Sequence, residues 1–146
     1  MRAVVQRVSS GSVSVDGEPL AEQGLGLFVL VGLRAGDTVA DAVALAGKVS
    51  RLRVFEDAAG KMNLSVREAG GSLVVVSEFT LYGDARKGNR PSYADAMPVE
   101  EAREFWPRVE AAFRDTGIPC GFGRYQAMMT CDIRNEGPVT ILVEIP

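Results

Sequence analysis

Two nearly unbroken apolar runs constrain the fold of this chain more than any other feature. They cover residues 24–32 and 73–79 and contain almost no polar side chains before their ends. Runs of this length without alternation are typical of strands buried on both faces, so each run predicts a central strand of a sheet. Each is followed by a helical pattern, which indicates an α/β fold in which strand-helix-strand occurs twice.

The two helical patterns have recognisable starts. The first can be capped by Asp37 or Thr38 and extends to about residue 51, with apolar residues at three- and four-residue spacing. The second begins at Pro98, which suits a first helical turn. We expect Pro107 to kink or divide this second helix, because proline removes one backbone donor and crowds the preceding turn.

The other predicted strands are shorter or alternate. Residues 2–9 and 12–15 alternate apolar and polar and lead into Asp16-Gly17, a strong hairpin signal. Further strands are expected over residues 54–55, 122–133 and 139–145. No linker or low-complexity tract interrupts the chain, so residues 1–146 are expected to form a single domain.

Composition places the chain among ordinary globular proteins, with 47% hydrophobic and 24% charged residues. No apolar run approaches the roughly 20 residues that cross a bilayer, and no signal-peptide pattern follows Met1, so we expect a cytoplasmic protein without membrane contact. Cys120 and Cys131 are then expected to be reduced and structural. The net charge is −3, so any RNA contact must come from a local basic patch.

The chain contains no histidine. This excludes Ser-His and Cys-His nucleophile pairs and every metal site with a histidine ligand. Any chemistry must therefore use backbone dipoles, hydroxyl groups or the substrate itself.

The segment Ser77-Glu78-Phe79-Thr80 ends the second apolar run. Backbone N–H groups around Phe79 and Thr80 lack ladder partners where a strand ends, and they can converge on an ester carbonyl as an oxyanion hole. Hydroxyl residues at strand ends also satisfy backbone groups without any further role, so the segment alone leaves both interpretations open. Direct attack by Thr80 is the weaker option, because no histidine can act as its base.

Two other segments are candidates for recognition. Gly137-Pro138 precedes the last predicted strand, and its fixed φ and bare Cα allow carbonyl groups to face a ligand, although an ordinary turn is the alternative. Arg86, Lys87 and Arg90 lie in a polar connection, where they form either a solvated loop or a flexible phosphate contact.

Five segments in register from end to end complete the pattern: residues 1–8, 60–64, 77–81, 86–92 and 135–140. Together they closely resemble the D-aminoacyl-tRNA deacylases. The resemblance implies a homodimer whose subunits have β/β/α layers, with mixed, largely antiparallel sheets and two main helices. It also implies a proofreading hydrolase that removes D-amino acids from the terminal adenosine of tRNA without a metal or other cofactor.

The resemblance further assigns roles to residues. In the family the Gly-Pro bond is cis and crosses the dimer interface, which places Gly137 and Pro138 against residues 77–80 of a second copy, with Arg7 as a brace. A rigid carbonyl pair then occupies the space that an L side chain needs. Glycine has no side chain to exclude, so some hydrolysis of glycyl-tRNA is expected. The segment of Tyr125, Gln126, Ala127 and Met129 corresponds to the one that packs the adenine, and Asn135 and Glu78 are also assigned to substrate binding.

Three positions depart from the family pattern. Glu78 replaces the usual glutamine, Gln126 replaces glycine, and Met128 stands where an acidic or polar residue is common. An ionised carboxylate only accepts hydrogen bonds, whereas an amide also donates them. The sequence leaves open whether Glu78 attracts the substrate's ammonium group or repels its phosphates.

Two alternatives to the deacylase remain. One is a non-catalytic dimer that binds RNA ends or nucleotides on the same scaffold. The other is a hydrolase of small metabolites, whose activity would not depend on salt or on the basic residues of the 86–92 segment.

Overall fold

The computed structural model describes all residues, 1–146, and has the mixed α/β character predicted from the sequence. Its elements are β1 (Arg2–Val15), β2 (Glu18–Gln23), β3 (Gly26–Gly32), α1 (Val39–Ser50), β4 (Phe55–Glu56), β5 (Met62–Leu64), β6 (Ser72–Ser77), the 3₁₀ helix η1 (Phe79–Tyr82), α2 (Val99–Arg114), β7 (Cys120–Phe122) and β8 (Thr130–Glu144).

The main sheet has the strand order β2-β1-β3-β6-β7, and β8 pairs with β1. Pairing is antiparallel among β1, β2, β3 and β8, whereas β3, β6 and β7 are parallel. Strands β4 and β5 form a separate two-stranded sheet. The mixed, largely antiparallel sheet expected from the resemblance is confirmed.

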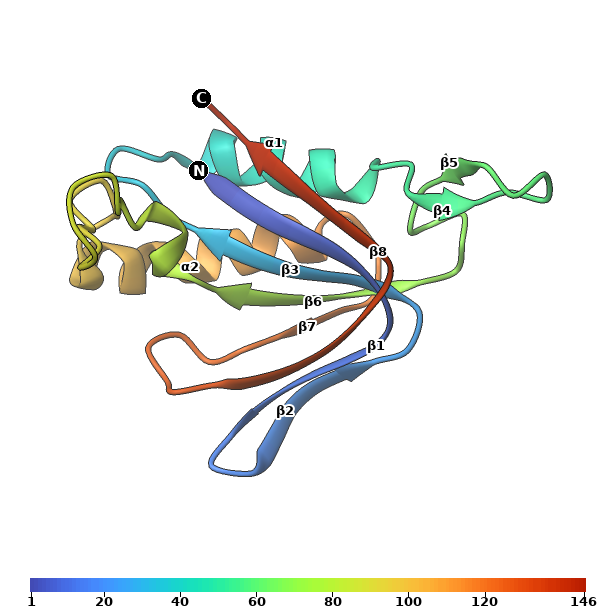
Figure 1. Cartoon of the computed structure of the whole chain (residues 1–146), viewed down its shortest axis with the longest axis horizontal. Helices are drawn as coiled ribbons and strands as arrows, with labels where there is room; N and C mark the ends of the chain where they lie inside the picture. The colour runs from blue at the N-terminus through green and yellow to red at the C-terminus, as the bar shows by residue number, and fades with distance from the viewer.

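The layers come from a bend in the two longest strands. The register between β1 and β8 shifts between Gln6 and Val8 and again between Val8 and Ser10, and bulges of this kind bend and twist a sheet. Figure 1 shows α1 and α2 behind the sheet, while the lower parts of β1 and β8, with β2, turn across its other side. The result is the expected β/β/α arrangement.

The two central strands are buried on both faces, as predicted. In β3, Leu27, Val29 and Val31 belong to the larger hydrophobic cluster beneath the helices, whereas Phe28 belongs to a second cluster. In β6, Leu73 and Val75 join the first cluster and Val74 and Val76 the second. Each strand therefore connects two cores, which explains its lack of alternation.

The predicted starts of both helices are confirmed, but the predicted division of the second helix at Pro107 is not observed. Thr38 caps α1 through a capping box with Asp41, and this contact lowers the pKa of the Asp41 carboxyl. Pro98 is the N-cap of α2, and the helix runs unbroken through Pro107. The expected division does not occur, because Pro107 and Arg103 are exposed and the carbonyl left without a donor can face water.

Several strand boundaries were predicted wrongly. Residues 2–15 form one strand, β6 ends at Ser77, and the strand expected over 122–133 is instead β7, a loop over 123–129 and the start of β8. Apolar side chains made that loop look extended. A turn from the Ala127 N–H to the Arg124 carbonyl and a left-handed Gln126 (φ 64°) reverse the chain. The Asp16-Gly17 hairpin is confirmed, and neither helix has the length and apolar character that a membrane span needs.

Candidate functional site

The 77–80 segment is held where β6 leaves the sheet. The Glu78 N–H donates to the Val31 carbonyl at 2.8 Å, which extends the ladder one residue beyond Ser77. The Glu78 carboxylate then caps η1 and accepts hydrogen bonds from both the amide and the hydroxyl of Thr80. Ser77 and Glu78 are half-buried, whereas Phe79 and Thr80 are exposed.

This cap changes what the oxyanion hypothesis requires. The Thr80 amide has no ladder partner, as expected, but it is taken up by Glu78 Oε1 at 3.3 Å. An ester carbonyl must displace this carboxylate in order to use the Thr80 amide. Glu78 is one of the three residues that depart from the family pattern. Its carboxylate therefore changes the availability of the Thr80 amide, which is one of the proposed oxyanion donors.

An aromatic pair flanks the segment. The ring of Phe79, which is 59% exposed, meets Tyr93 edge to face with centroids 5.1 Å apart. Tyr93 comes from the polar connection that follows η1. Exposed rings in this geometry offer an apolar surface beside the backbone amides.

The same connection carries the basic residues predicted to contact tRNA. Asp84 and Ser92 exchange backbone hydrogen bonds and close residues 84–92 into a loop. Arg86 forms a bidentate pair with Asp84 and lowers the pKa of that carboxyl to about 2. Lys87 and Arg90 are exposed and make no ion pair, so they are the cations of this loop that remain free for an anion.

The 123–129 loop contains the predicted adenine contacts. Tyr125 stacks on Trp106, and its hydroxyl donates to the Val99 carbonyl at 3.2 Å. Gln126 accepts two hydrogen bonds from Arg103. Met128 is 88% exposed, whereas Met129 packs on the second core and Ala127 is half-buried.

The fold brings this loop and the 77–80 segment to one end of the sheet. Strands β6 and β7 are parallel neighbours, so the residues after each emerge on the same side, at the left of Figure 1. The first residues of β8 are also close. Burial and the nearby charges of Glu78 and Asp132 raise the pKa of the Cys131 thiol.

The 77–80 segment and the 123–129 loop form one constellation, and a second surrounds Gly137-Pro138. Asn135 pairs with Val8 and Thr140 pairs with Gln6, so residues 136–139 bulge out of β8 opposite Arg7 alone. We call residues 136–139 the Gly-Pro bulge. The Asn135 amide group closes its base, since it donates to the Thr140 hydroxyl (2.9 Å) and accepts from the Val139 amide (3.1 Å).

Arg7 braces the bulge by donating to two backbone carbonyls, one in the bulge and one outside it. Its Nε donates to the Glu136 carbonyl at 3.2 Å, and its Nη1 donates to the Val54 carbonyl at 2.7 Å. The Gly137–Pro138 peptide bond is cis, and Gly137 has φ 124°. A Cβ on Gly137 would lie 2.8 Å from a methyl group of Val139 and 3.1 Å from the Arg7 guanidinium, so only glycine fits.

One chain does not bring the two constellations together. Arg7 pairs with Leu27 and thus lies level with Leu73, whereas Ser77 pairs with Val31 at the far end of β6. Strands β1 and β3 lie between β8 and β6. The Gly-Pro bulge therefore cannot face the 77–80 segment of its own chain.

Sequence reasoning missed Tyr93 and Arg103. Both contact predicted site residues through the fold, and neither has a local motif that would indicate the contact. No group of three or more acidic, cysteine or histidine side chains is placed to ligate a metal ion.

Comparison with known proteins assigns the family. The chain matches the family described as D-Tyr-tRNA(Tyr) deacylase over residues 4–144. It is 51% identical to the D-aminoacyl-tRNA deacylase of Myxococcus xanthus over 146 residues, covering 100% of this chain and 95% of that protein. It is 50% identical to that of Carboxydothermus hydrogenoformans over 145 residues, covering 99% and 100%.

Two solved structures are also similar. The c-Myc DNA Unwinding Element Binding Protein superposes with a TM-score of 0.93 at 39% identity, covering 100% of this chain and 99% of that one. A probable eukaryotic D-amino acid tRNA deacylase shares the fold, with a TM-score of 0.83 at 15% identity over 99% and 98%. With the match over nearly its whole length and relatives at about half identity, this chain belongs to the D-Tyr-tRNA(Tyr) deacylase family.

Proposed function

We propose that this chain hydrolyses the ester between a D-amino acid and the terminal adenosine of tRNA, at sites that are each built from two copies. The family match and the names of the full-length relatives support the reaction. The absence of histidine is compatible with it, because an aminoacyl ester is already activated and needs little acid-base assistance.

The proposal that each site needs two copies is based on the separation of the two constellations within one chain. Within one chain, two strands stand between the Gly-Pro bulge and the 77–80 segment. A bulge from one copy can reach the 77–80 segment of another only across an interface between subunits. The rigid bulge then acts as a filter that a substrate must pass.

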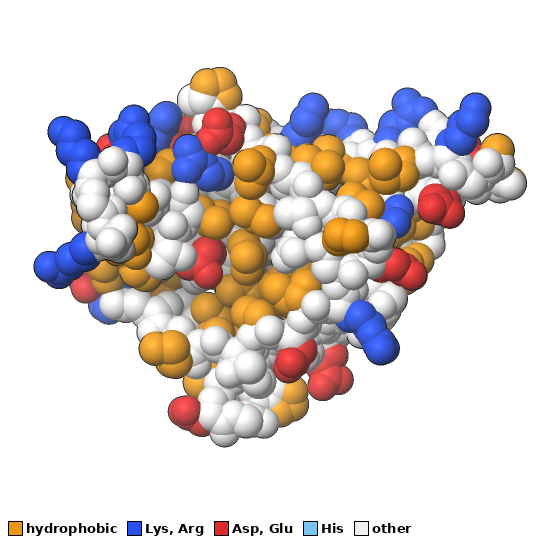
Figure 2. All heavy atoms as spheres, in the orientation of Figure 1, with side chains coloured by type: hydrophobic (Ala, Val, Ile, Leu, Met, Phe, Trp, Pro, Cys, Tyr) orange, Lys and Arg blue, Asp and Glu red, His pale blue; other side chains and the backbone are white.

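An exposed apolar row supports a second copy at this face. Val4 pairs with Leu30 on one side and with Leu142 on the other, so their side chains form a row on the sheet face that the helices leave uncovered. Leu142 is 71% exposed. Figure 2 shows a broad apolar patch in the middle of this face. Patches of this kind mark protein interfaces, and β8 carries both Leu142 and the bulge.

Handedness is selected by exclusion in this proposal. The carbonyl groups of Gly137 and Pro138 fill the space on the side of the α-carbon where an L side chain would lie. A D side chain points elsewhere and is accepted. Glycine passes the same filter, so glycyl-tRNA is hydrolysed as well.

The chemistry uses the amides of Phe79 and Thr80 to stabilise the developing oxyanion. The substrate's α-ammonium group attracts the Glu78 carboxylate by a charge-assisted contact and releases the Thr80 amide from it. A positioned water attacks the ester carbonyl, and the 2′-hydroxyl of the terminal ribose assists as the leaving oxygen departs. Ser77 and Thr80 position these groups and form no covalent intermediate.

Recognition of the nucleic acid completes the proposal. Tyr125, Gln126, Ala127 and Met129 form the support for the adenine, and exposed Met128 adds a thioether surface. Lys87 and Arg90 meet backbone phosphates, whereas Arg86 contributes less because Asp84 neutralises it.

Incubation with D-Tyr-tRNA, L-Tyr-tRNA and Gly-tRNA tests the reaction. We expect free D-tyrosine and glycine to appear while L-Tyr-tRNA is spared. Binding of D-Tyr-tRNA without release of tyrosine would instead support the non-catalytic RNA-binding dimer. Equal cleavage of both tyrosyl esters would contradict the filter.

Thr80→Ala tests the chemical route. Activity reduced by about tenfold is expected, because the variant loses a positioning hydroxyl and keeps the amide. Loss below detection, together with a trapped acyl-enzyme on the native protein, would contradict the water route.

A further inference from the structure

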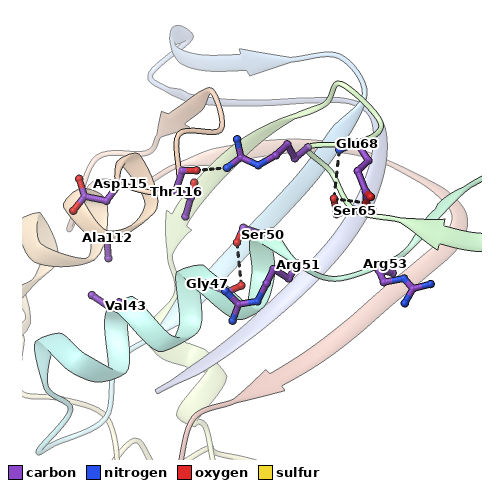
Figure 3. Close-up of a pocket in the computed structure, with 11 residues that line it drawn as sticks. Val43, Gly47, Ser50, Arg51, Arg53, Ser65, Glu68, Ala112, Asp115 and Thr116 are labelled. Atoms are coloured by element: carbon purple, nitrogen blue, oxygen red, sulfur yellow. Dashed lines mark hydrogen bonds between the residues drawn. The ribbon is translucent and has the colours of Figure 1, made fainter.

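A groove of about 760 Å³ opens on the helix side of the molecule, and none of its lining residues belongs to the constellations described above. It lies among the last turns of α1 and α2 and the turn over residues 65–68 (Figure 3). Three arginines line it: Arg51, Arg53 and Arg67. All three are exposed, and none forms an ion pair.

The arginines keep most of their donors free. The Arg51 guanidinium makes no hydrogen bond, Arg53 uses Nε and Nη2 on Asn63, and Arg67 uses Nη2 on the Thr116 carbonyl. The remaining N–H groups are available to an anion in the planar arrangement that suits phosphate oxygens.

Two carboxylates also line the groove, and they do not cancel its charge. Glu68 accepts from the amide and hydroxyl of Ser65, contacts that hold the pKa of its carboxyl low. Asp115 at the end of α2 makes no ion pair. The lining therefore carries three cations against two anions, one of which is already hydrogen-bonded.

Gly47 leaves space for the Arg51 guanidinium beside α1. It lies inside α1, where glycine costs about 1 kcal/mol relative to alanine. The atoms nearest to a Cβ at this position would be those of the Arg51 guanidinium, with Nη1 at 3.1 Å. The missing side chain lets the guanidinium lie close against the helix, and Figure 3 shows the Arg51 side chain beside Gly47.

The groove is linked to the Gly-Pro bulge. Arg53 is followed by Val54, whose carbonyl accepts from the same Arg7 that braces the bulge. The Arg53 edge of the groove is thus connected to the bulge through Val54 and Arg7. An open groove of this size suits an extended run of phosphates better than one small anion.

We propose that this groove binds the phosphodiester backbone of the RNA whose 3′ end reaches the bulge. The inference rests on the proposed function for the identity of the RNA. Its recognition chemistry is that of phosphate oxygens with arginine, which an RNA backbone and free phosphates share.

Fluorescence anisotropy with a labelled acceptor-stem RNA hairpin that has a single-stranded 3′ end tests the proposal. For Arg51→Gln/Arg67→Gln in the full chain, we expect affinity to fall about fivefold at low salt and the salt slope to fall by about two. Lys48→Gln is the matched control, because it removes a charge from the same helix end outside the groove. Unchanged affinity and slope in the double variant, or equal losses in the control, would overturn the proposal.

Gly47→Ala gives an independent readout. It should raise the melting temperature by about 2 °C, because alanine favours the helix, and yet weaken RNA binding about twofold by displacing Arg51. A stabilised variant with full RNA affinity would contradict the role of this glycine.

Two further measurements are needed. One distinguishes an RNA backbone from free phosphate as the ligand of the groove, and the other distinguishes failure of the groove proposal from failure of the proposed function. Titration with inorganic phosphate or tripolyphosphate should show binding at least about tenfold weaker than that of the hairpin; tighter binding of these anions would overturn the RNA assignment. D-aminoacyl-adenosine, which has no backbone phosphate, should be cleaved equally by native protein and the double variant. Failure of the native protein to cleave it would contradict the proposed function, while the hairpin arm would still test the groove.

Discussion

The 77–80 segment and the Gly-Pro bulge differ in how the fold holds them. A backbone bond from Glu78 joins the segment to β3, and its exposed end is held by the Glu78 carboxylate, which is shared between two groups of Thr80. The bulge is fixed by bonds to its backbone from Arg7 and Asn135 and leaves no room for a Cβ at Gly137. A filter must not yield to the substrate, whereas an oxyanion site must exchange one partner for another, so the stiff region suits selection and the adjustable region suits chemistry.

Gly137→Ala should break this comparison most severely. The new Cβ cannot fit beside Val139 and Arg7, so the bulge must shift by a few tenths of an ångström or more. Misplacement of this kind lowers D-aminoacyl-tRNA turnover by about 100-fold, measured by release of the labelled amino acid. Gly36→Ala is the control, because Gly36 also has a positive φ but open space around it, and it should retain activity.

Leu142→Asp should separate the two regions by removing the second copy. A charge in the apolar row opposes association, and we expect a monomer by analytical ultracentrifugation and about 30-fold lower activity. Leu25→Asp places the same charge on an exposed leucine outside the row and should leave the oligomeric state unchanged. A fully active monomer would contradict assembly of the site from two copies.

Glu78→Gln should sharpen the account of the adjustable region. An amide still accepts from Thr80 but attracts the substrate's ammonium group less, so kcat/KM should fall about fivefold. An ester that lacks the α-ammonium group serves as the control substrate and should not distinguish the two proteins. An equal loss on both esters would assign Glu78 to holding Thr80 alone.

Gln126→Gly should have the smallest effect. Glycine relieves the left-handed conformation of residue 126 but loses the exposed contact with Arg103, so the free energy of unfolding should rise by less than about 1 kcal/mol. Chemical denaturation measures this change. A marked destabilisation would show that the Arg103 contact, and not the backbone, determines the shape of the 123–129 loop.

The sequence predicts the parts of the fold that depend on local patterns. The double-sided burial of β3 and β6 follows from their unbroken apolar runs, and the α1 cap follows from Thr38. The predicted strand over residues 122–133 is wrong because the left-handed backbone of Gln126 reverses the chain, and the side-chain pattern does not reveal this conformation. In β8, the Gly-Pro bulge interrupts the side-chain pattern of one long strand, so the sequence predicts two separate strands there.

The site is less predictable, because its contacts join residues far apart in the chain. Residues 77–80 and 135–140 are visible as motifs, but the capture of the Thr80 amide by Glu78 depends on the turn after β6. The contacts of Arg7 with Val54 and of Arg103 with Gln126 depend on strand register and helix packing. No local pattern contains this information.

Mixing two inactive variants tests the central claim most directly. Gly137→Ala spoils the bulge, and Thr80→Trp covers the 77–80 segment from an exposed position, so each alone should be inactive on D-Tyr-tRNA. After unfolding and refolding together at equal amounts, half of the dimers are mixed and each contains one intact site, so about a quarter of native activity should return. Absence of any recovery, with mixed dimers demonstrated by mass spectrometry, would contradict a site shared between two copies.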